Sequence, residues 1–482
     1  MSKHTFWIAL LTLFSFTAVD LLAQGGRRRR GGRRISRQPT PPPEPEKKKD
    51  KKPKSYLAIK NADVYIGTGQ RIRNCDILVA DDKIEKVGPG IEIPKEAKVI
   101  DAKNKVVSPG FVAVKASGIG IPRFGGRGSK DSSIKDSVNP FDPTIKMGLA
   151  AGVTTYCSLS GSGTGKPGGT SALIKLAYGD LAGMVLKEKS VMSMRVPLSM
   201  AQMKSFRDLV KKAREHKKAV AKHLAEEGKA PAPAAGKPAR TPPPGRGRSG
   251  RTGRGSGRGT ARSAGAKKAP KPPKGTEDIL KVMDGEVRLW ITGAQSNDRI
   301  RQAMKVAELL GVGVVLDSPT TAWSMPDEVA AQGSMAIVNP RENRRPDPAR
   351  KDTTGSNIRM CAILAAAGVP VAVTPPGGRF GGAGLGTGGI LGQDLHTPHI
   401  DAAYAVRGGL DNAKALRTIT LDAAKIIGAD ARIGSIEPGK DADILILDGD
   451  PLHYRTFVQI AIVNGKVVYE KDKEPFYRHI KR

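Results

Sequence analysis

The sequence predicts an α/β protein in which a β-α region, forming a parallel barrel or a doubly wound sheet, is joined to a small β domain. Three observations support this: the chain begins with short alternating strands, continues with repeated β-α units, and returns to short alternating strands. We place the β domain, a composite sandwich of both chain ends, at residues 55–106 and 432–482. The β-α region is placed at residues 107–431, with a low-complexity insertion at about 226–275.

The first strands follow from an alternation of apolar and polar residues. LAIKNADVYIG and CDILVADDKIEKVGP alternate in this way, and turn residues stand at Thr68-Gly69, Asp81-Asp82 and Pro89-Gly90. The pattern predicts short antiparallel strands. GSIEPGKDADILILDGDP and QIAIVNGKVVYEKD repeat it at the other end of the chain, so we expect the two ends to meet.

The middle of the chain alternates buried strands with helices. The apolar runs VTTYCSL, VRLWI, VGVVL, MAIVN and VPVAV are typical of parallel strands covered on both faces. SNDRIRQAMKVAELLGV and NIRMCAILAAAGV carry apolar residues at helical spacing. Repeated β-α units of this kind predict a parallel sheet.

The net charge of +34 is concentrated in two segments. Residues 25–54 carry 13 Lys or Arg against 3 Asp or Glu, and residues 204–275 carry 21 against 4. The rest of the chain is an ordinary domain, so the charge does not indicate a nucleic-acid-binding fold. Residues 206–225 predict a basic helix, while the linker at 25–54 and the Pro/Gly/Arg-rich residues 228–275 are expected to be disordered.

These basic segments suggest partners of opposite charge. We expect attraction to an acidic envelope polymer or a membrane surface, and the alternative is a solvated tether. Nucleic acid is not an expected partner, because the Arg-Gly stretch has no Phe or Tyr for base stacking. Residues 1–24 read as a signal peptide, with an apolar run from Phe6 to Val19. We therefore expect a protein exported to the periplasm, the cell envelope or the extracellular space, and a retained anchor is the alternative to cleavage.

Smaller motifs exclude other classes of protein. GSGTGKPGG at 161–169 is not a phosphate loop, because Ser160 and Pro167 break the required pattern; a flexible loop over the barrel mouth is the alternative. GGRFGGAGLGTGG at 377–389 is interpreted as a mobile lid or an irregular loop. The odd, widely spaced Cys75, Cys157 and Cys361 predict small buried residues and neither a disulfide framework nor a metal site.

The C-terminal motif IGSIEPGKDADILILDGDPL, followed by IVNGKVVYEKD, resembles the amidohydrolase superfamily and its imidazolonepropionase-like branch. LRTITLDAAKIIG, VVSPGFVAV and the strand-helix-strand segment from Gly285 to Trp323 resemble the same family. The resemblance covers about 57–205 and 276–473. It implies a TIM-type (β/α)8 barrel beside a composite β-sandwich, with one or two divalent metals such as zinc at the carboxyl ends of the barrel strands.

The positions that resemble the family's metal ligands hold other residues. Lys115 and Ser117 fall in the segment of the family's His-x-His, Thr292 and Ser318 at its two later histidines, and Thr374 begins the segment of its aspartate. The chain has seven histidines: His4, His216, His223, His396, His399, His453 and His479. Only His396 and His399 lie in the barrel segment, so we expect no metal cofactor and no assignable catalytic residue.

Three functions remain open from the sequence. The first is a degenerate amidohydrolase that serves as a binding or scaffolding module for an unknown small molecule, with a homo-oligomer possible. The second is a hydrolase of non-peptide carbon-nitrogen bonds that uses an atypical or metal-free route. The third is a basic, envelope-associated adaptor. Lys115, Thr292 and Asp317 are the candidate residues at the barrel mouth, where Lys115 and Asp317 form either an interior ion pair or a weak acid-base pair.

Overall fold

The computed structural model describes residues 54–121, 134–158, 162–227, 270–375, 385–386, 398–475 and 477–480. Lys54–Arg482 form one compact unit. The signal peptide, nearly all of the linker, most of the insertion and His396 lie outside the described residues. Within the described part of the chain, no helix has both the length and the apolar character needed to cross a membrane.

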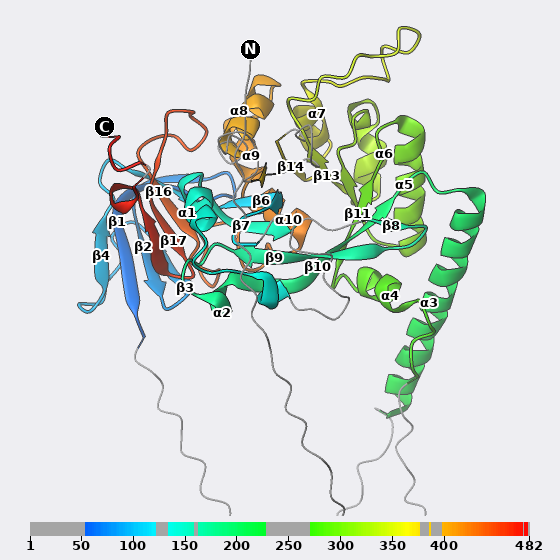
Figure 1. Ribbon diagram of the computed structural model, residues 1–482, viewed down its shortest axis with the longest axis horizontal. Coiled ribbons are helices and arrows are strands. Elements are labelled where there is room, and N and C mark those ends of the chain that lie inside the picture. The colour runs from blue at the N-terminus through cyan, green and yellow to red at the C-terminus, as the bar shows by residue number, and fades with distance from the viewer. Residues whose placement is uncertain are drawn as a thin grey trace, which may run out of the picture. The chain divides into compact units, whose positions relative to one another are not determined.

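Both ends of the chain contribute to one eight-stranded sheet (Figure 1). Its order is β18-β17-β16-β5-β1-β2-β3, with β4 paired to β1. An isolated bridge between Lys83 and Asp441 brings β3 close to the segment before β16, so the sheet curls around its own core. The strands are β1 (Tyr56–Tyr65), β2 (Arg71–Ala80), β3 (Lys83–Gly88), β4 (Lys98–Asp101), β5 (Val106–Pro109), β16 (Ile444–Leu447), β17 (Val458–Val463) and β18 (Lys466–Glu470).

The second sheet forms a nearly closed barrel, as predicted. Its order is β14-β13-β12-β11-β10-β9-β7-β6-β15, with β8 paired to β10. The strands are β6 (Phe111–Ser117), β7 (Val153–Ser158), β8 (Gly163–Thr164), β9 (Gly168–Lys175), β10 (Val185–Arg195), β11 (Arg288–Thr292), β12 (Val315–Asp317), β13 (Met335–Val338), β14 (Val371–Val373) and β15 (Leu385–Gly386).

One barrel strand runs against the others. β9 is antiparallel to both β7 and β10, whereas the remaining neighbours pair in parallel. The glycine-rich stretch at 161–169 causes this, because it forms β8 and the start of β9 where a flexible loop was expected. A short turn can join antiparallel strands, while parallel strands need a longer crossover. The expectation of a plain loop was therefore wrong for Gly163–Thr164 and from Gly168 onward.

Helices cover the outer face of the barrel. The amphipathic pattern from Ser296 gives α5, which ends at Gly311 in the left-handed conformation. The predicted basic helix is longer than expected, and the chain after the insertion is described again from Pro270. The helices are α1 (Pro143–Ala150), α2 (Leu181–Met184), α3 (Met200–Glu227), α4 (Glu277–Met283), α5 (Asn297–Leu310), α6 (Pro326–Ala331), α7 (Met360–Ala366), α8 (Pro398–Arg407), α9 (Asn412–Arg417) and α10 (Leu421–Ile427).

The helix α10 fills the inside of the barrel instead of covering it. Its Ala423, Ile426 and Ile427 share a buried cluster with inward residues such as Val112 and Trp290. The indole nitrogen of Trp290 donates to the Ile426 carbonyl at 3.5 Å. The preceding turn lies between the first and last long strands: the carbonyls of Thr418 and Ile419 accept from the amides of Val373 and Val112.

Candidate functional site in the barrel mouth

An ion pair lies inside the barrel near the carboxyl ends of its strands. The ammonium of Lys115 is 2.8 Å from Oδ1 and 2.9 Å from Oδ2 of Asp317. Their side chains are 10% and 12% exposed, and they come from β6 and β12, which are far apart in the sheet order. The pair therefore spans the interior at the rim where barrel proteins carry their sites. We call Lys115 and Asp317 the mouth pair.

An irregularity in β6 accounts for the position of Lys115. Val112 and Val114 belong to the inward cluster, so strict alternation would turn Lys115 outward. The ladder between β6 and β7 shifts register between Ala113 and Ala116, as in a β-bulge. Such a shift redirects side chains at the end of a strand, which allows Lys115 to reach Asp317.

Ser318 supports the carboxylate from the next position. Its φ of 56° is left-handed, and its amide donates to the Ile337 carbonyl at 2.9 Å. Its hydroxyl donates to Oδ1 of Asp317 at 3.1 Å. Asp317 thus accepts from an ammonium and a hydroxyl. Ser318, which occupies the position that resembles a family histidine, lies beside the inward carboxylate.

Thr292 contacts a second hydroxyl. Its Oγ1 is 3.2 Å from Oγ of Ser162, which immediately precedes β8. Thr292 ends β11 two residues after the inward Trp290, so strand alternation directs it to the same face. The structure brings Lys115 and Asp317 together and gives Thr292 a different partner.

The structure also contains two buried hydroxyls without a hydrogen-bond partner among the described residues, which the sequence did not reveal. The Oγ1 atoms of Thr155 and Thr374 have no hydrogen-bond partner within the described part of the chain, and both residues are at most 1% exposed. Each lies two residues from an inward member of the barrel cluster, Cys157 and Ala372 respectively. A buried hydroxyl without a partner costs about 1–3 kcal/mol, so both sites favour a bound polar group.

The three cysteines are buried and free, as predicted. Burial raises the pKa of the Cys157 thiol to about 12. A hydrogen bond with Ser171 and the charge of Lys115 oppose that rise. The thiolate is the nucleophilic form, so Cys157 is unreactive near neutral pH. Burial also raises the pKa of Cys361 to about 12.

The donors in the mouth do not fit a divalent metal. No cluster of three or more His, Cys, Asp or Glu side chains suited to a metal occurs among the described residues. Asp317 is the carboxylate nearest to Lys115, whose ammonium occupies both of its oxygens. The ring of His399 lies 6.5 Å from that of Phe111, which belongs to the outer-face core, so His399 packs outside the barrel.

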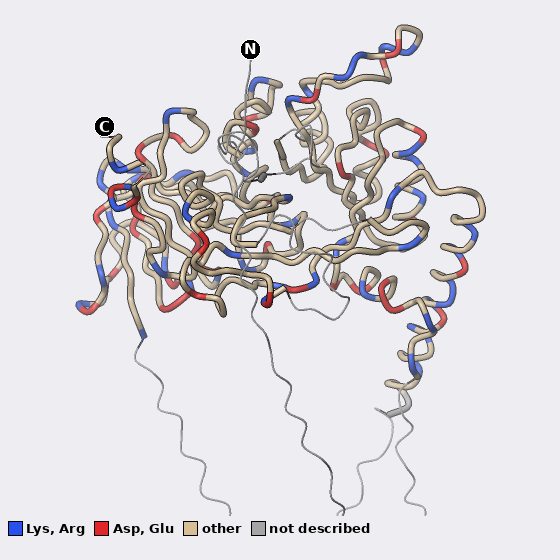
Figure 2. Tube along the Cα trace, in the orientation of Figure 1, with Lys and Arg blue, Asp and Glu red and all other residues tan. Residues whose placement is uncertain are grey.

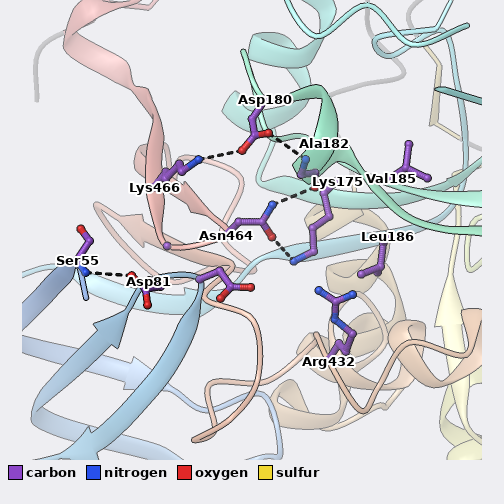
Figure 3. A pocket seen from close by; sticks show the side chains of 13 residues that line it. Ser55, Asp81, Lys175, Asp180, Ala182, Val185, Leu186, Arg432, Asn464 and Lys466 are labelled. Atoms are coloured by element: carbon purple, nitrogen blue, oxygen red, sulfur yellow. Dashed lines mark hydrogen bonds and ion pairs between the residues drawn. The ribbon is translucent and has the colours of Figure 1, made fainter. Parts of the chain in front are cut away.

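A second ionic cluster lies at the opposite end of the barrel, where β9 meets the composite sheet. The ammonium of Lys175 contacts Oδ2 of Asp441 at 2.6 Å, Asp443 at 2.9 Å and Oδ1 of Asn464 at 2.7 Å. Lys175 and Asp441 are almost completely buried. Figure 3 shows Lys175 directed at Asn464 beside a cavity of about 470 Å³.

Two further cations approach the same carboxylate. Arg432 binds Asp441 through Nε at 3.2 Å and Nη2 at 2.7 Å, and Lys83 donates to its Oδ1. Burial alone would raise the pKa of Asp441. Lys175 and the other donors together outweigh burial, so the pKa lies below its usual value. We call Lys83, Lys175, Arg432, Asp441, Asp443 and Asn464 the junction cluster.

The fold is an α/β barrel beside a composite β-sheet, and its mouth carries the ion pair of Lys115 and Asp317. Residues 313–473 match the model of the amidohydrolase family. An amidohydrolase from Thermotoga maritima MSB8 shares the fold, with a TM-score of 0.60, 24% identity and coverage of 86% of this chain and 100% of that one. The matched third of the chain is thus similar to the amidohydrolase family, and the chain shares the fold of the Thermotoga structure.

Two curated relatives match shorter segments. A 5-methylthioadenosine/S-adenosylhomocysteine deaminase from Symbiobacterium thermophilum is 31% identical over 24% of this chain and 33% of its own length. A dihydroorotase from Caldicellulosiruptor saccharolyticus is 41% identical over 12% of this chain and 14% of its own length. The chain thus aligns with a third or less of the length of these relatives.

Proposed function

We propose that this chain is an exported, degenerate member of the superfamily whose barrel mouth binds a small polar molecule instead of hydrolysing a carbon-nitrogen bond at a metal. The mouth pair is the observation that carries the proposal. It places an ammonium on both oxygens of Asp317, where a metal would need an unoccupied carboxylate.

The repulsion between the Lys115 ammonium and a metal ion can be given a magnitude. A divalent ion about 4 Å from the Lys115 ammonium would be repelled by roughly 8 kcal/mol at an effective dielectric constant of about 20, twice the value for two unit charges. The family's metal sites avoid this cost by using neutral histidines, whereas the corresponding positions here include Lys115, Thr292 and Ser318. A metal could occupy this position only if Lys115 turned away from Asp317.

The chemistry of the mouth supports a neutral ligand rich in hydrogen-bonding groups. Thr374, directly after β14, offers a hydroxyl without a partner among the described residues, and Thr292 and Ser162 offer a hydroxyl pair. The single ion pair is already neutral overall, so it gives little net attraction for a strongly charged ligand. A small molecule with several hydroxyl or amide groups matches these donors and acceptors.

A metal-free hydrolase is the second candidate, and the Ser318 hydroxyl beside Asp317 favours it. A carboxylate next to a hydroxyl can assist proton transfer during attack on a carbonyl. The ammonium of Lys115 already contacts both oxygens of Asp317, which makes this candidate the less supported of the two.

One experiment separates the two candidates from a metal enzyme. Purified full-length chain is analysed for metal content and then incubated with cyclic amides and aminopurine nucleosides, the substrate classes suggested by the names of the two relatives. We expect substoichiometric zinc, no turnover and saturable binding in a screen of small polar molecules. Stoichiometric zinc with turnover would overturn the proposal, and turnover that is unaffected by a chelator but lost in Asp317→Asn would favour the metal-free hydrolase.

Export needs its own test. We expect the full-length chain, expressed in a Gram-negative host, to appear outside the cytoplasm and to be shortened near residue 24, because residues 1–24 resemble a signal peptide. Fractionation and N-terminal sequencing provide the measurement. Retention of the intact chain in the cytoplasm would contradict export, while loss of surface retention on deleting 228–275 would favour the adaptor function.

A further inference from the structure

The helix α3 carries a continuous row of basic side chains. Lys and Arg recur at three- and four-residue steps, which places them on one face within about 80° of arc at 100° per residue. Over 18 residues the row spans about 27 Å at 1.5 Å per residue. We call this row the basic stripe; it consists of Lys204, Arg207, Lys211, Arg214, Lys218 and Lys222.

The stripe lies on the solvent side of the helix. All six of its side chains are exposed, whereas Met203, Phe206, Val210 and Ala213 form the buried face. Figure 2 shows several Lys and Arg positions along α3, with acidic positions between them. Contacts with the barrel hold the helix in place: Arg214 donates to the Leu309 carbonyl at 2.7 Å, and Lys217 pairs with Asp284.

A neighbouring helix shows the ordinary arrangement. The exposed face of α5 mixes signs, with ion pairs from Lys305 to Glu308 and from Arg301 to Asp298. The stripe places like charges at five successive three- or four-residue steps, and the two exposed acids beside it, Asp208 and Glu215, are outnumbered by its six cations. Asp208 and Glu215 compensate only part of this charge, so the stripe keeps an excess of cations that a partner with regularly spaced negative charges would balance.

We propose that the basic stripe of α3 binds a linear phosphate polymer along the helix. The row of cations complements a chain of closely spaced anions, and binding would release counterions from the polymer. This proposal is independent of the function proposed for the barrel mouth. It assigns the binding site to a described helix rather than to the basic segments that lie outside the described residues.

Two other polyanions match the stripe less well. Insertion into a membrane surface requires an exposed apolar face on the helix, but Met203, Phe206 and Val210 are buried against the barrel. Recognition of single-stranded nucleic acid uses aromatic side chains for stacking, and Phe206, the aromatic residue of α3, is buried. The stripe offers charge without either of these features.

The test compares two triple substitutions in the full chain. Lys204→Gln, Lys211→Gln and Lys218→Gln remove half of the stripe and keep helix propensity nearly unchanged. Lys86→Gln, Lys95→Gln and Lys103→Gln remove the same charge from exposed positions of the composite sheet. Binding of inorganic polyphosphate is measured by titration calorimetry at several salt concentrations, and circular dichroism checks that both variants fold.

The stripe variant is expected to bind polyphosphate roughly tenfold more weakly at physiological salt, with a salt slope lower by about 2 for three lost contacts. The control variant is expected to bind like the unmodified chain. Equal weakening in both variants would reduce the effect to general charge attraction and overturn the proposal. So would binding of duplex DNA or anionic vesicles without binding of polyphosphate, or no binding of polyphosphate at all.

Discussion

The two buried lysines at opposite ends of the barrel differ in how completely they are satisfied. Lys175 contacts two carboxylates and an amide oxygen, and the carboxylate of Asp441 also accepts from Arg432 and Lys83. Lys115 contacts a single carboxylate in the hydrogen bonds described, and the Thr374 hydroxyl just after β14 has no partner among the described residues.

That difference is the basis for proposing a structural role for the junction cluster and a binding role for the mouth. A buried polar network with every member satisfied makes a structure rigid, while a partly satisfied one leaves groups that a ligand can use. The junction cluster joins β9 to the segment around β16, so it fastens the barrel to the composite sheet. The mouth pair leaves donors and acceptors for a ligand at the open rim.

The largest expected effect comes from breaking the junction cluster. Lys175→Met leaves Asp441 and Asp443 buried without their shared cation, which should lower the free energy of unfolding by about 3–5 kcal/mol. Urea denaturation followed by circular dichroism measures the change. Lys189→Met, at an exposed position of β10, is the matched control and should cost less than about 0.5 kcal/mol. Equal costs would mean that the cluster does not fasten the barrel.

Another buried carboxylate, that of Asp401, should make the stability of the protein depend on pH. Burial raises the pKa of Asp401 to about 6, while Arg341 opposes the rise from 2.7 Å. The unfolded carboxyl ionises near 3.8, so the stabilising contribution is complete below that pH and is lost as the pH rises to about 6. The loss amounts to about 3 kcal/mol.

Asp401→Asn should therefore flatten the fall in stability between about pH 4 and pH 6. Unfolding free energies measured at half-unit pH steps provide the check, with Asp298→Asn on the exposed start of α5 as the control. An unchanged pH profile in Asp401→Asn would show that Asp401 does not titrate in this window.

Breaking the mouth pair should cost less than breaking the junction cluster. Lys115→Met leaves the Asp317 carboxylate without its cation near the open rim. We therefore expect the free energy of unfolding to fall by roughly 2 kcal/mol, between the values for exposed and fully buried pairs. Adding Asp317→Leu should restore most of the stability but abolish binding of the small polar ligand. If the double variant still bound the ligand, the mouth pair would not be part of the binding site.

The smallest effect is expected at the rim of the junction cavity. Lys466 pairs with Asp180 at 2.9 Å, but its side chain is 68% exposed (Figure 3). Lys466→Met should change the unfolding free energy by less than about 1 kcal/mol. A loss comparable to that of Lys175→Met would remove the distinction between buried and exposed members of this region.

Local sequence patterns were sufficient for most of the fold. Alternating strands, helix ends such as Gly311 and the C-terminal motif predicted the barrel and the composite sheet. The strand ends indicated Lys115 and Asp317 as candidate residues, and the structure places these two side chains in contact. The antiparallel direction of β9 was missed, because glycine-rich residues 161–169 indicate a loop without specifying which strand follows it.

Long-range features could not be predicted for a physical reason. The apolar pattern of Leu421–Ile427 predicts burial but does not say whether the helix packs inside or outside the barrel. Lys175 and Asp441 are 266 positions apart, and no local pattern relates them. The unpaired hydroxyls of Thr155 and Thr374 likewise depend on their neighbours in space.

The junction cluster also constrains the order of folding during synthesis. Lys175 leaves the ribosome long before Asp441 and Asp443, so its ammonium has to stay hydrated until the last tenth of the chain appears. Contacts of such large sequence separation form slowly. We therefore infer that the end of the barrel at the junction cluster stays open during translation and closes only when the nearly complete chain has emerged.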